Sequence, residues 1–181
     1  MTDTGTITPT DERAELLSTL AEQRSALLIT VRGIGDAEST RRTTASRLTL
    51  AGLLKHVAAV ERSWTGVLTG RGWDSAADGG ATDDFVPAEG ETLAVLADRY
   101  AEVARETERA VAGLPGLDVG RPLPVRPWFP PGTVWSARRI LLHLIRETAQ
   151  HSGHADIIRE SLDGATTTPR LLADIGGTLP E

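Results

Sequence analysis

Four long segments of this chain repeat apolar residues at intervals of three and four, the spacing of one face of an α-helix. They run from Thr8 to Gly33, from Thr49 to Gly70, from Glu91 to Leu114 and from Ser136 to Gly164. Strand signals between them are weak. Helices that each present one apolar face bury it against one another. The sequence therefore predicts an all-α fold, a four-helix bundle with long crossover loops.

The ends of the first and last helices carry specific signals. Pro9 suits the first helical position, and Asp11 and Glu12 belong in the first turn. Ser136 is a favourable N-cap for the last helix, and Gly164 is a favourable C-cap. These signals set the bounds that we expect for both helices.

Two connections, residues 71–90 and 115–135, are too long to be simple turns. Loops of that length usually cross a fold or cover a site. Residues 123–128 give the best strand signal, but their prolines favour an extended loop or a sheet edge. The two connections contain aromatic residues, which indicates that they pack against the bundle: Trp73, Phe85, Trp128 and Phe129.

Length and composition narrow the organisation and the location. A chain of 181 residues suits one domain over residues 1–181, with a core at about 8–166. The C-terminal tail, 167–181, has room for one short helix, and disorder or contacts between subunits are the alternatives. No segment is apolar enough to span a membrane, and no secretory signal is recognisable, so we expect a cytoplasmic protein.

Charge and cysteine content exclude two kinds of function. The formal net charge is −6 and no long basic stretch occurs, which argues against nucleic-acid binding. The chain has no cysteine, so it offers neither a thiolate metal ligand nor a sulfur nucleophile of its own. Any sulfur chemistry would need a thiol supplied as a cosubstrate.

The last predicted helix carries ionisable side chains on its apolar face. At about 100° per residue, four of them fall within about 80° of one another, in line with Ile140 and Ile158. These four residues, the polar stripe, are His143, Glu147, His151 and His154. Burying polar groups costs free energy unless partners satisfy them, so the polar stripe needs an explanation.

Two interpretations of the polar stripe are open. In one, the histidines bond to the backbone or to each other, or border solvent. In the other, Glu147 and His151 hold a metal ion, because residues four apart on a helix point at the same place. His56, the one strongly coordinating side chain on its face of the second helix, is the candidate third ligand. Two histidines and a carboxylate suit zinc, nickel, iron(II) or manganese and leave positions open for water or substrate.

Three stretches resemble the DinB-like superfamily of metal-binding four-helix bundles. They are DERAELLSTLAEQRSALLITVRGI at 11–34, SRLTLAGLLKHVAAVERSW at 46–64 and HLIRETAQHSGHADIIRESLDG at 143–164. The likeness extends from about residue 11 to 166. The motif HxxxExxxHxGHxDxxRE is long, and it is similar to that of the mycothiol S-transferase-like branch.

The resemblance implies how the site is built. It implies a divalent metal, usually zinc or nickel, held by His56, Glu147 and His151. Many relatives have a histidine where this chain has Glu147, whereas mycothiol-dependent maleylpyruvate isomerases carry glutamate and histidine at the same spacing as here. His143 and His154 then orient the ligands or line the substrate pocket. The alternative, an ordinary core or rim histidine, is the one that we favour for His143.

The resemblance also implies a function. Relatives join a low-molecular-weight thiol to an electrophile, or isomerise a substrate with the help of a thiol. We therefore expect a divalent-metal-dependent S-transferase of the mycothiol type, whose partners are a small-molecule thiol and an electrophile. A metal-dependent hydrolase or isomerase and a non-catalytic metal-binding stress protein are the alternatives. Dimers are common among relatives, so a homodimer is compatible with the resemblance, although no residue pattern indicates one.

Three residues outside the proposed ligand set are candidates for binding the substrate. Arg146 and Arg159 flank the polar stripe and suit an anionic substrate, with surface ion pairs to Glu160 or Asp156 as the alternative. Trp128 lies in the proline-rich connection before the last helix and suits a lid over the site. Loop packing is the simpler account of Trp128.

Overall fold

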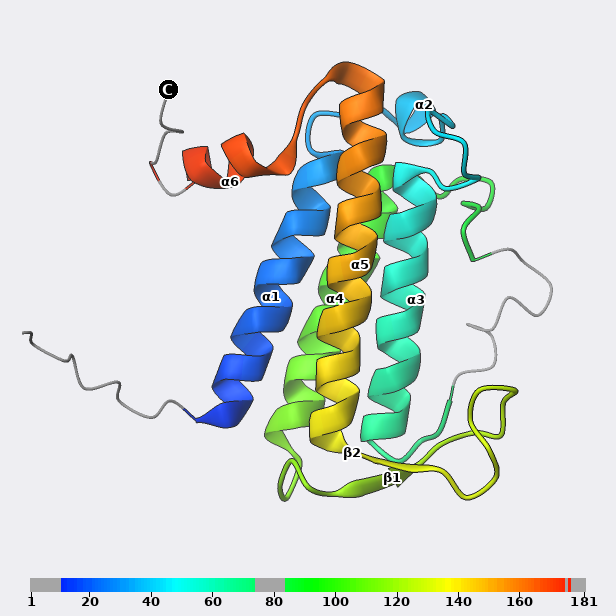
Figure 1. Cartoon of the computed structure of the whole chain (residues 1–181), viewed down its shortest axis with the longest axis vertical. Coiled ribbons are helices and arrows are strands. Elements are labelled where there is room, and N and C mark those ends of the chain that lie inside the picture. The colour runs from blue at the N-terminus through cyan, green and yellow to red at the C-terminus, as the bar shows by residue number, and fades with distance from the viewer. Residues whose placement is uncertain (1–10, 74–83, 175, 177–181) are drawn as a thin grey trace, which may run out of the picture.

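Four long helices pack side by side and form the body of the molecule (Figure 1). The computed structural model describes residues 11–73, 84–174 and 176. Its helices are α1 (Glu12–Val31), α2 (Asp36–Ser39), α3 (Leu50–Leu68), α4 (Leu93–Ala112), α5 (Ala137–Asp163) and α6 (Thr167–Asp174). Its strands are β1 (Gly120–Pro122) and β2 (Val134–Ser136). The predicted four-helix bundle is confirmed, with a small sheet added.

Contacts between helix ends give the direction of each helix. Arg138 at the start of α5 donates to Glu12 at the start of α1, with Nε and Oε1 2.5 Å apart, so these two helices begin at the same end. Lys55 in the first turns of α3 bonds Glu91, just before α4, so these two helices begin at the same end as each other. Figure 1 shows that this end is opposite to the one where α1 and α5 begin. The connection from α3 to α4 therefore joins opposite ends of the bundle, as the predicted crossover requires (Figure 1).

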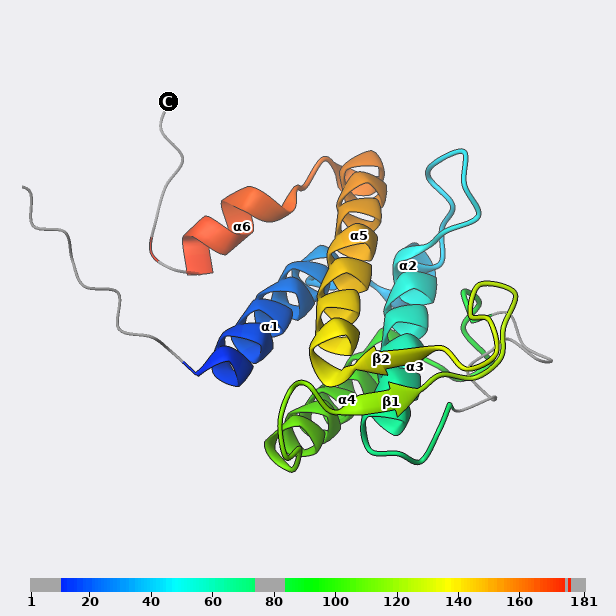
Figure 2. The same ribbon diagram turned by 60° about the horizontal axis from the view of Figure 1, so that its bottom comes forward.

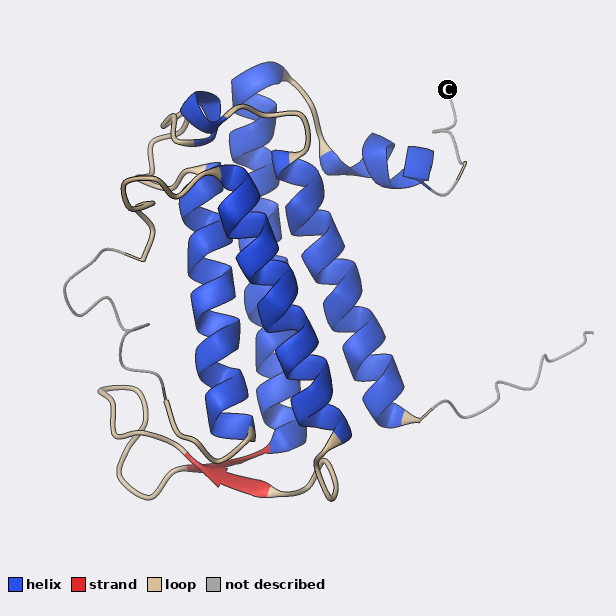
Figure 3. Cartoon of the chain, turned by 180° about the vertical axis from the view of Figure 1, so that it is seen from behind, coloured by secondary structure: helices blue, strands red, loops and turns tan. Residues whose placement is uncertain are grey.

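A two-stranded antiparallel sheet closes one end of the bundle (Figures 2 and 3). It pairs Gly120 with Ser136 and Pro122 with Val134. Residues 123–128 lie in the loop between the strands, as their prolines predicted, and Arg126 bridges to Phe129 there. Proline has no N–H to donate to a ladder, so the bonds of this segment come from residues beside the prolines, such as Leu123, whose N–H donates to the Thr133 carbonyl.

The predicted helix ends are mostly confirmed. The Ser136 side chain accepts from the backbone N–H of Arg139, and Gly164 ends α5 with a φ of 78°. Asp11 is the N-cap of α1 rather than part of its first turn, since its carboxylate accepts from the N–H of Arg13. The expected start at Thr8 and Pro9 lies outside the described residues. The short helix expected in the tail is α6, whereas the sequence did not indicate α2.

The core has two apolar clusters, one toward each end of the bundle. Trp64, Leu141 and Leu144 belong to the cluster near the sheet. Leu54 and Ile158 belong to the cluster at the far end. The segments of α3 and α5 that carry the candidate ligands lie where the two clusters meet. Among the described helices, none combines the length and the apolar character that a membrane crossing requires.

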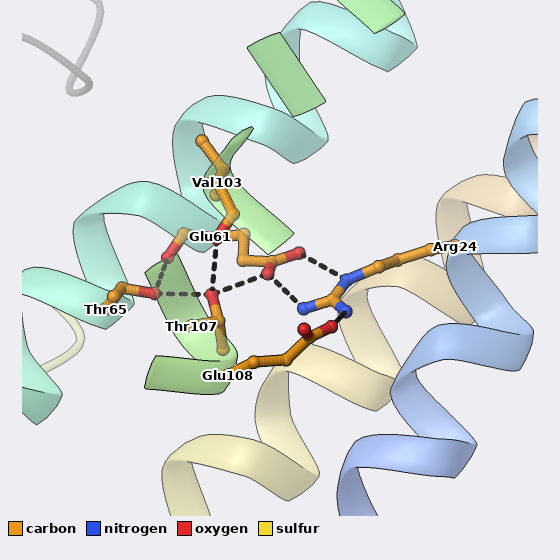
Figure 4. Close-up of polar contacts among 6 residues, drawn as sticks. All are labelled: Arg24, Glu61, Thr65, Val103, Thr107 and Glu108. Carbon is orange, nitrogen blue, oxygen red and sulfur yellow. Dashed lines mark hydrogen bonds and ion pairs between the residues drawn. The ribbon is translucent and has the colours of Figure 1, made fainter. Parts of the chain in front are cut away.

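A buried ion pair joins three of the long helices (Figure 4). Arg24 of α1 donates from both Nε and Nη2 to the carboxylate of Glu61 on α3. Thr107 of α4 donates to Glu61 at 2.7 Å and lies 2.8 Å from the hydroxyl of Thr65. Glu61 is fully buried, so its charge is balanced entirely by these partners, which fixes the relative placement of the helices.

Candidate metal centre and its cleft

The three predicted ligands come together between α3 and α5. Nε2 of His151 lies 3.3 Å from Oε1 of Glu147, and Nε2 of His56 lies 3.9 Å from the same oxygen. One ligand atom from each residue falls within 4.8 Å of the others. These three side chains therefore lie together, as the sequence predicted. Two imidazole nitrogens and a carboxylate oxygen form a donor set that suits a divalent metal ion such as zinc, nickel, iron(II) or manganese.

The carboxylate of Glu147 is held in its charged form. Hydrogen bonding to His151, and then to His56, keeps the pKa of Glu147 far below its usual range, although partial burial opposes this. The other ring nitrogen of His56, Nδ1, is buried without a hydrogen-bond partner among the described residues. The orientation of the His56 ring is therefore set by packing and by what its Nε2 contacts.

Phe85 covers His56 from the crossover connection. The two rings are stacked with their centroids 4.0 Å apart and 19° between their planes. Lys55 holds this part of the connection on α3, donating to the Val86 carbonyl at 2.9 Å and pairing with Glu91 at 3.0 Å. The expectation that Phe85 packs against the bundle is confirmed, and its place explains how the crossover shields a candidate ligand from water.

His143 and His154 lie on opposite sides of the triad. Nδ1 of His154 lies 3.4 Å from Nδ1 of His151, so His154 can orient that ligand. His143 packs its ring on Trp64 and Trp135, with centroids 4.8 and 5.5 Å away. Burial lowers the pKa of His143, which favours its neutral form.

A cleft of about 540 Å³ opens beside the triad. His56 and Glu147 lie in its wall, so the candidate metal centre faces into it. All four tryptophans of the chain line the same cleft: Trp64, Trp73, Trp128 and Trp135. Trp128 is 69% exposed, so it stands at the mouth of the cleft, whereas Phe129 is buried beneath it.

Arg159 lies away from the cleft, contrary to the expectation that it binds substrate. It is buried, and its guanidinium donates to the backbone carbonyls of Thr30 and Arg32, both at 2.8 Å. Its ion pair is with Asp163 rather than with Glu160 or Asp156. The physical reason is that the carbonyls at the C-terminal end of α1 lack helical partners and attract a cationic donor.

Sequence reasoning missed two parts of the site. Arg139 and Trp135 line the cleft together with Arg146. The spacing of Arg139, four residues before His143, could have revealed it, because such residues share a helix face. Glu61 lies outside the cleft, and no sequence pattern singled it out as the anchor of a buried network.

Comparisons with known proteins found one matching family and a similar solved structure. A family model described as mycothiol S-transferase matches residues 15–164. A crystal structure of a conserved protein from Enterococcus faecalis is similar over 87% of this chain and 100% of that chain, with a TM-score of 0.64. The two sequences are 17% identical, so this likeness shows the fold alone. No curated protein matches the chain in a sequence search.

Proposed function

The chain belongs to the mycothiol S-transferase family, in the DinB-like superfamily, and from this premise we propose that it is a divalent-metal-dependent S-transferase. It joins a low-molecular-weight thiol of the mycothiol type to an electrophile. The observation that carries the proposal is the convergence of His56, Glu147 and His151 beside an aromatic cleft. A cation held by these three residues would supply the positive charge that lowers the pKa of an incoming thiol.

The chain's own residues have distinct parts in the reaction. Glu147, held ionised by His151 and His56, offsets part of the positive charge at the centre and so leaves the sulfur more nucleophilic. Phe85 covers His56 and limits the access of water. The tryptophans of the cleft bind the electrophile by apolar contact and hold it close to the sulfur.

The reaction balances without a redox partner. The thiol gives its proton to solvent, and the sulfur forms a bond to the electrophilic carbon. Where that carbon carries a leaving group, the group departs with the bonding electron pair. Where the carbon belongs to an activated double bond, the neighbouring carbon takes up a proton instead. The lack of cysteine in the chain is consistent with a thiol that arrives as a substrate.

Metal content and thiol transfer test the proposal together. We expect the purified protein to contain zinc or nickel, and to transfer mycothiol to 1-chloro-2,4-dinitrobenzene. Chelation should abolish the transfer, and either metal should restore it. Transfer that persists after complete metal removal contradicts the proposal.

A ligand variant with a matched control locates the chemistry. His151→Gln should lower kcat/KM by at least about 100-fold, because loss of a ligand costs more than the 10- to 100-fold typical of a supporting residue. His154→Gln should lower kcat/KM only by the 10- to 100-fold typical of a supporting residue. A protein that binds metal and cleaves esters but does not use a thiol would be a hydrolase. A protein that takes up no metal would have a binding or structural role. The cytoplasmic location stays a prediction from the sequence, and the homodimer stays a proposal that is compatible with the family resemblance.

A further inference from the structure

Two arginines of α5 stand on the wall of the cleft. At about 100° per residue, Arg139 and Arg146 lie within about 20° of each other around the helix, and two turns separate them. The guanidinium carbon of Arg139 lies 4.4 Å from the ring centroid of Trp135. Arg146 donates from Nη2 to Nδ1 of His143 at 2.9 Å. The wall therefore presents two guanidinium groups beside stacked aromatic rings.

Neither guanidinium has a carboxylate partner within the described part of the chain. By contrast, Arg24, Arg138 and Arg159 each pair with an acid. The chain has a net charge of −6, so acidic partners are abundant. A guanidinium has five donors, and the single bond to His143 leaves most of those of Arg146 available.

The rest of the cleft restricts the shape of a ligand. Trp64 and Trp135 are stacked, with centroids 5.1 Å apart and planes 4° from parallel. Asp84 and Glu147 are the acids in the lining. Glu147 is bonded to His151, and Arg139 lies about 12 Å before Glu147 along the helix axis. A flat ligand with an anionic end near the arginines could thus reach toward the triad.

We propose that Arg139 and Arg146 form a subsite for the carboxylate of a flat, unsaturated or aromatic substrate, whose body lies along the tryptophans. Charged fork-shaped donors match the geometry of a carboxylate. The proposal rests on the proposed function, since it concerns the same cleft. It makes these arginines the residues that decide which substrates enter.

Binding can be measured without turnover, because all four tryptophans line the cleft. Their fluorescence is titrated with 3-nitrobenzoate and with the uncharged 3-nitrobenzamide. We expect the benzoate to bind about tenfold more tightly, which corresponds to one charged hydrogen bond. The titration is repeated with a chelator, so that a carboxylate bound directly to a metal ion is not mistaken for the subsite.

Charge variants identify the source of the preference. The double variant Arg139→Gln and Arg146→Gln should bind both ligands equally, and its affinity for the amide should equal that of the wild type. Arg109→Gln, on α4, removes a charge from an exposed residue outside the cleft and should keep the preference. A wild type without a preference, or a double glutamine variant that retains one, overturns the proposal.

A lysine pair keeps the proposal testable if the glutamine pair is unstable. Arg139→Lys and Arg146→Lys retain both charges without the fork of donors, so this variant should still bind the benzoate more tightly than the amide, by a smaller factor than the wild type. Its failure to do so overturns the proposal.

Turnover then shows which substrate carries the carboxylate. The electrophiles are 4-chloro-3-nitrobenzoate and its methyl ester, and the thiols are 3-mercaptopropionate and 2-mercaptoethanol. In each reaction the carbon–sulfur bond forms, the carbon–chlorine bond breaks, chloride leaves and the thiol proton passes to buffer. If the double glutamine variant reacts more slowly only with the charged electrophile, the electrophile carries the carboxylate. If it reacts more slowly only with the charged thiol, the thiol carries the carboxylate. Equal effects on charged and uncharged pairs overturn the subsite, whereas a lack of any turnover counts against the S-transferase and leaves the binding result standing.

Discussion

Glu61 shows how much depends on one buried residue. Its carboxylate is 0% exposed and bonds Arg24 and Thr107. A buried ion pair contributes little net stability compared with apolar packing, but removal of one partner leaves an uncompensated charge in the core. Removal of Glu61 alone should therefore lower stability by more than the net amount that the ion pair contributes to it.

This asymmetry predicts the effect of two substitutions. Glu61→Gln should lower the free energy of unfolding by about 3 kcal/mol, because Arg24 stays charged and buried. Glu108 is the other carboxylate near Arg24, and its side chain is 51% exposed. Glu108→Gln should therefore lower the free energy of unfolding by less than about 1 kcal/mol. Urea denaturation followed by circular dichroism measures both. Similar losses in the two variants would show that burial of Glu61 is not the cause.

The crossover connection is the element that ties the fold to the site. Gly52 of α3 faces the backbone of Phe85, and a Cβ at this position would overlap the Phe85 carbonyl oxygen. Glycine is therefore required where the connection approaches the helix. The close approach brings the Phe85 ring over His56.

Gly52→Ala is expected to displace this cover. The substitution should lower stability by about 1–3 kcal/mol, as overpacking does, and should weaken zinc binding because His56 loses its stacking partner. Gly153→Ala is the matched control, since a Cβ there meets nothing within 4 Å. It should raise stability by about 0.5–1 kcal/mol through helix propensity. Thermal unfolding and zinc titration test both variants, and unchanged zinc affinity in Gly52→Ala would contradict a role for the cover.

The end of the same connection predicts a pH dependence. Burial alone would raise the pKa of Glu91, but bonds from the Ala88 N–H, Arg99 and Lys55 outweigh burial and lower the pKa to about 2. A carboxyl whose pKa is lower in the folded state stabilises the fold above its unfolded pKa, and this contribution is lost as the pH falls. The difference in the free energy of unfolding between the wild type and Glu91→Gln should have its full size above about pH 4.5. It should shrink as the pH falls and vanish toward pH 2. Urea titrations at a series of pH values would contradict this if the difference did not change.

At the scale of the whole molecule, the candidate metal centre links α3 to α5. A cation bound only by the folded chain stabilises it by about 2.7 kcal/mol at 100 times its Kd. Zinc or nickel should therefore raise the Tm of the wild type, and His56→Gln should remove the rise. His143→Gln, which leaves the triad intact, should keep it. An equal rise in all three proteins would place the metal elsewhere.

Features within one helix could be predicted from the sequence. The N-cap Ser136 and the C-cap Gly164 were predicted correctly because capping depends on neighbouring backbone groups. The i, i+4 pair of Glu147 and His151 followed from helical periodicity. His56 was the candidate third ligand because it is the one strongly coordinating side chain on its face of the second helix, and the family resemblance implied the same residue. The structure brings it to the pair.

Features that join separate helices were decided by the tertiary structure. Arg159 looked like a substrate ligand by its spacing, but packing of α5 on α1 turns it to the carbonyls of Thr30 and Arg32. The burial of Glu61 and the place of Arg139 on the cleft also depend on which helix faces which. Periodicity places a side chain on a face of its own helix, whereas the partner that meets this face is selected by the burial of apolar surface throughout the chain.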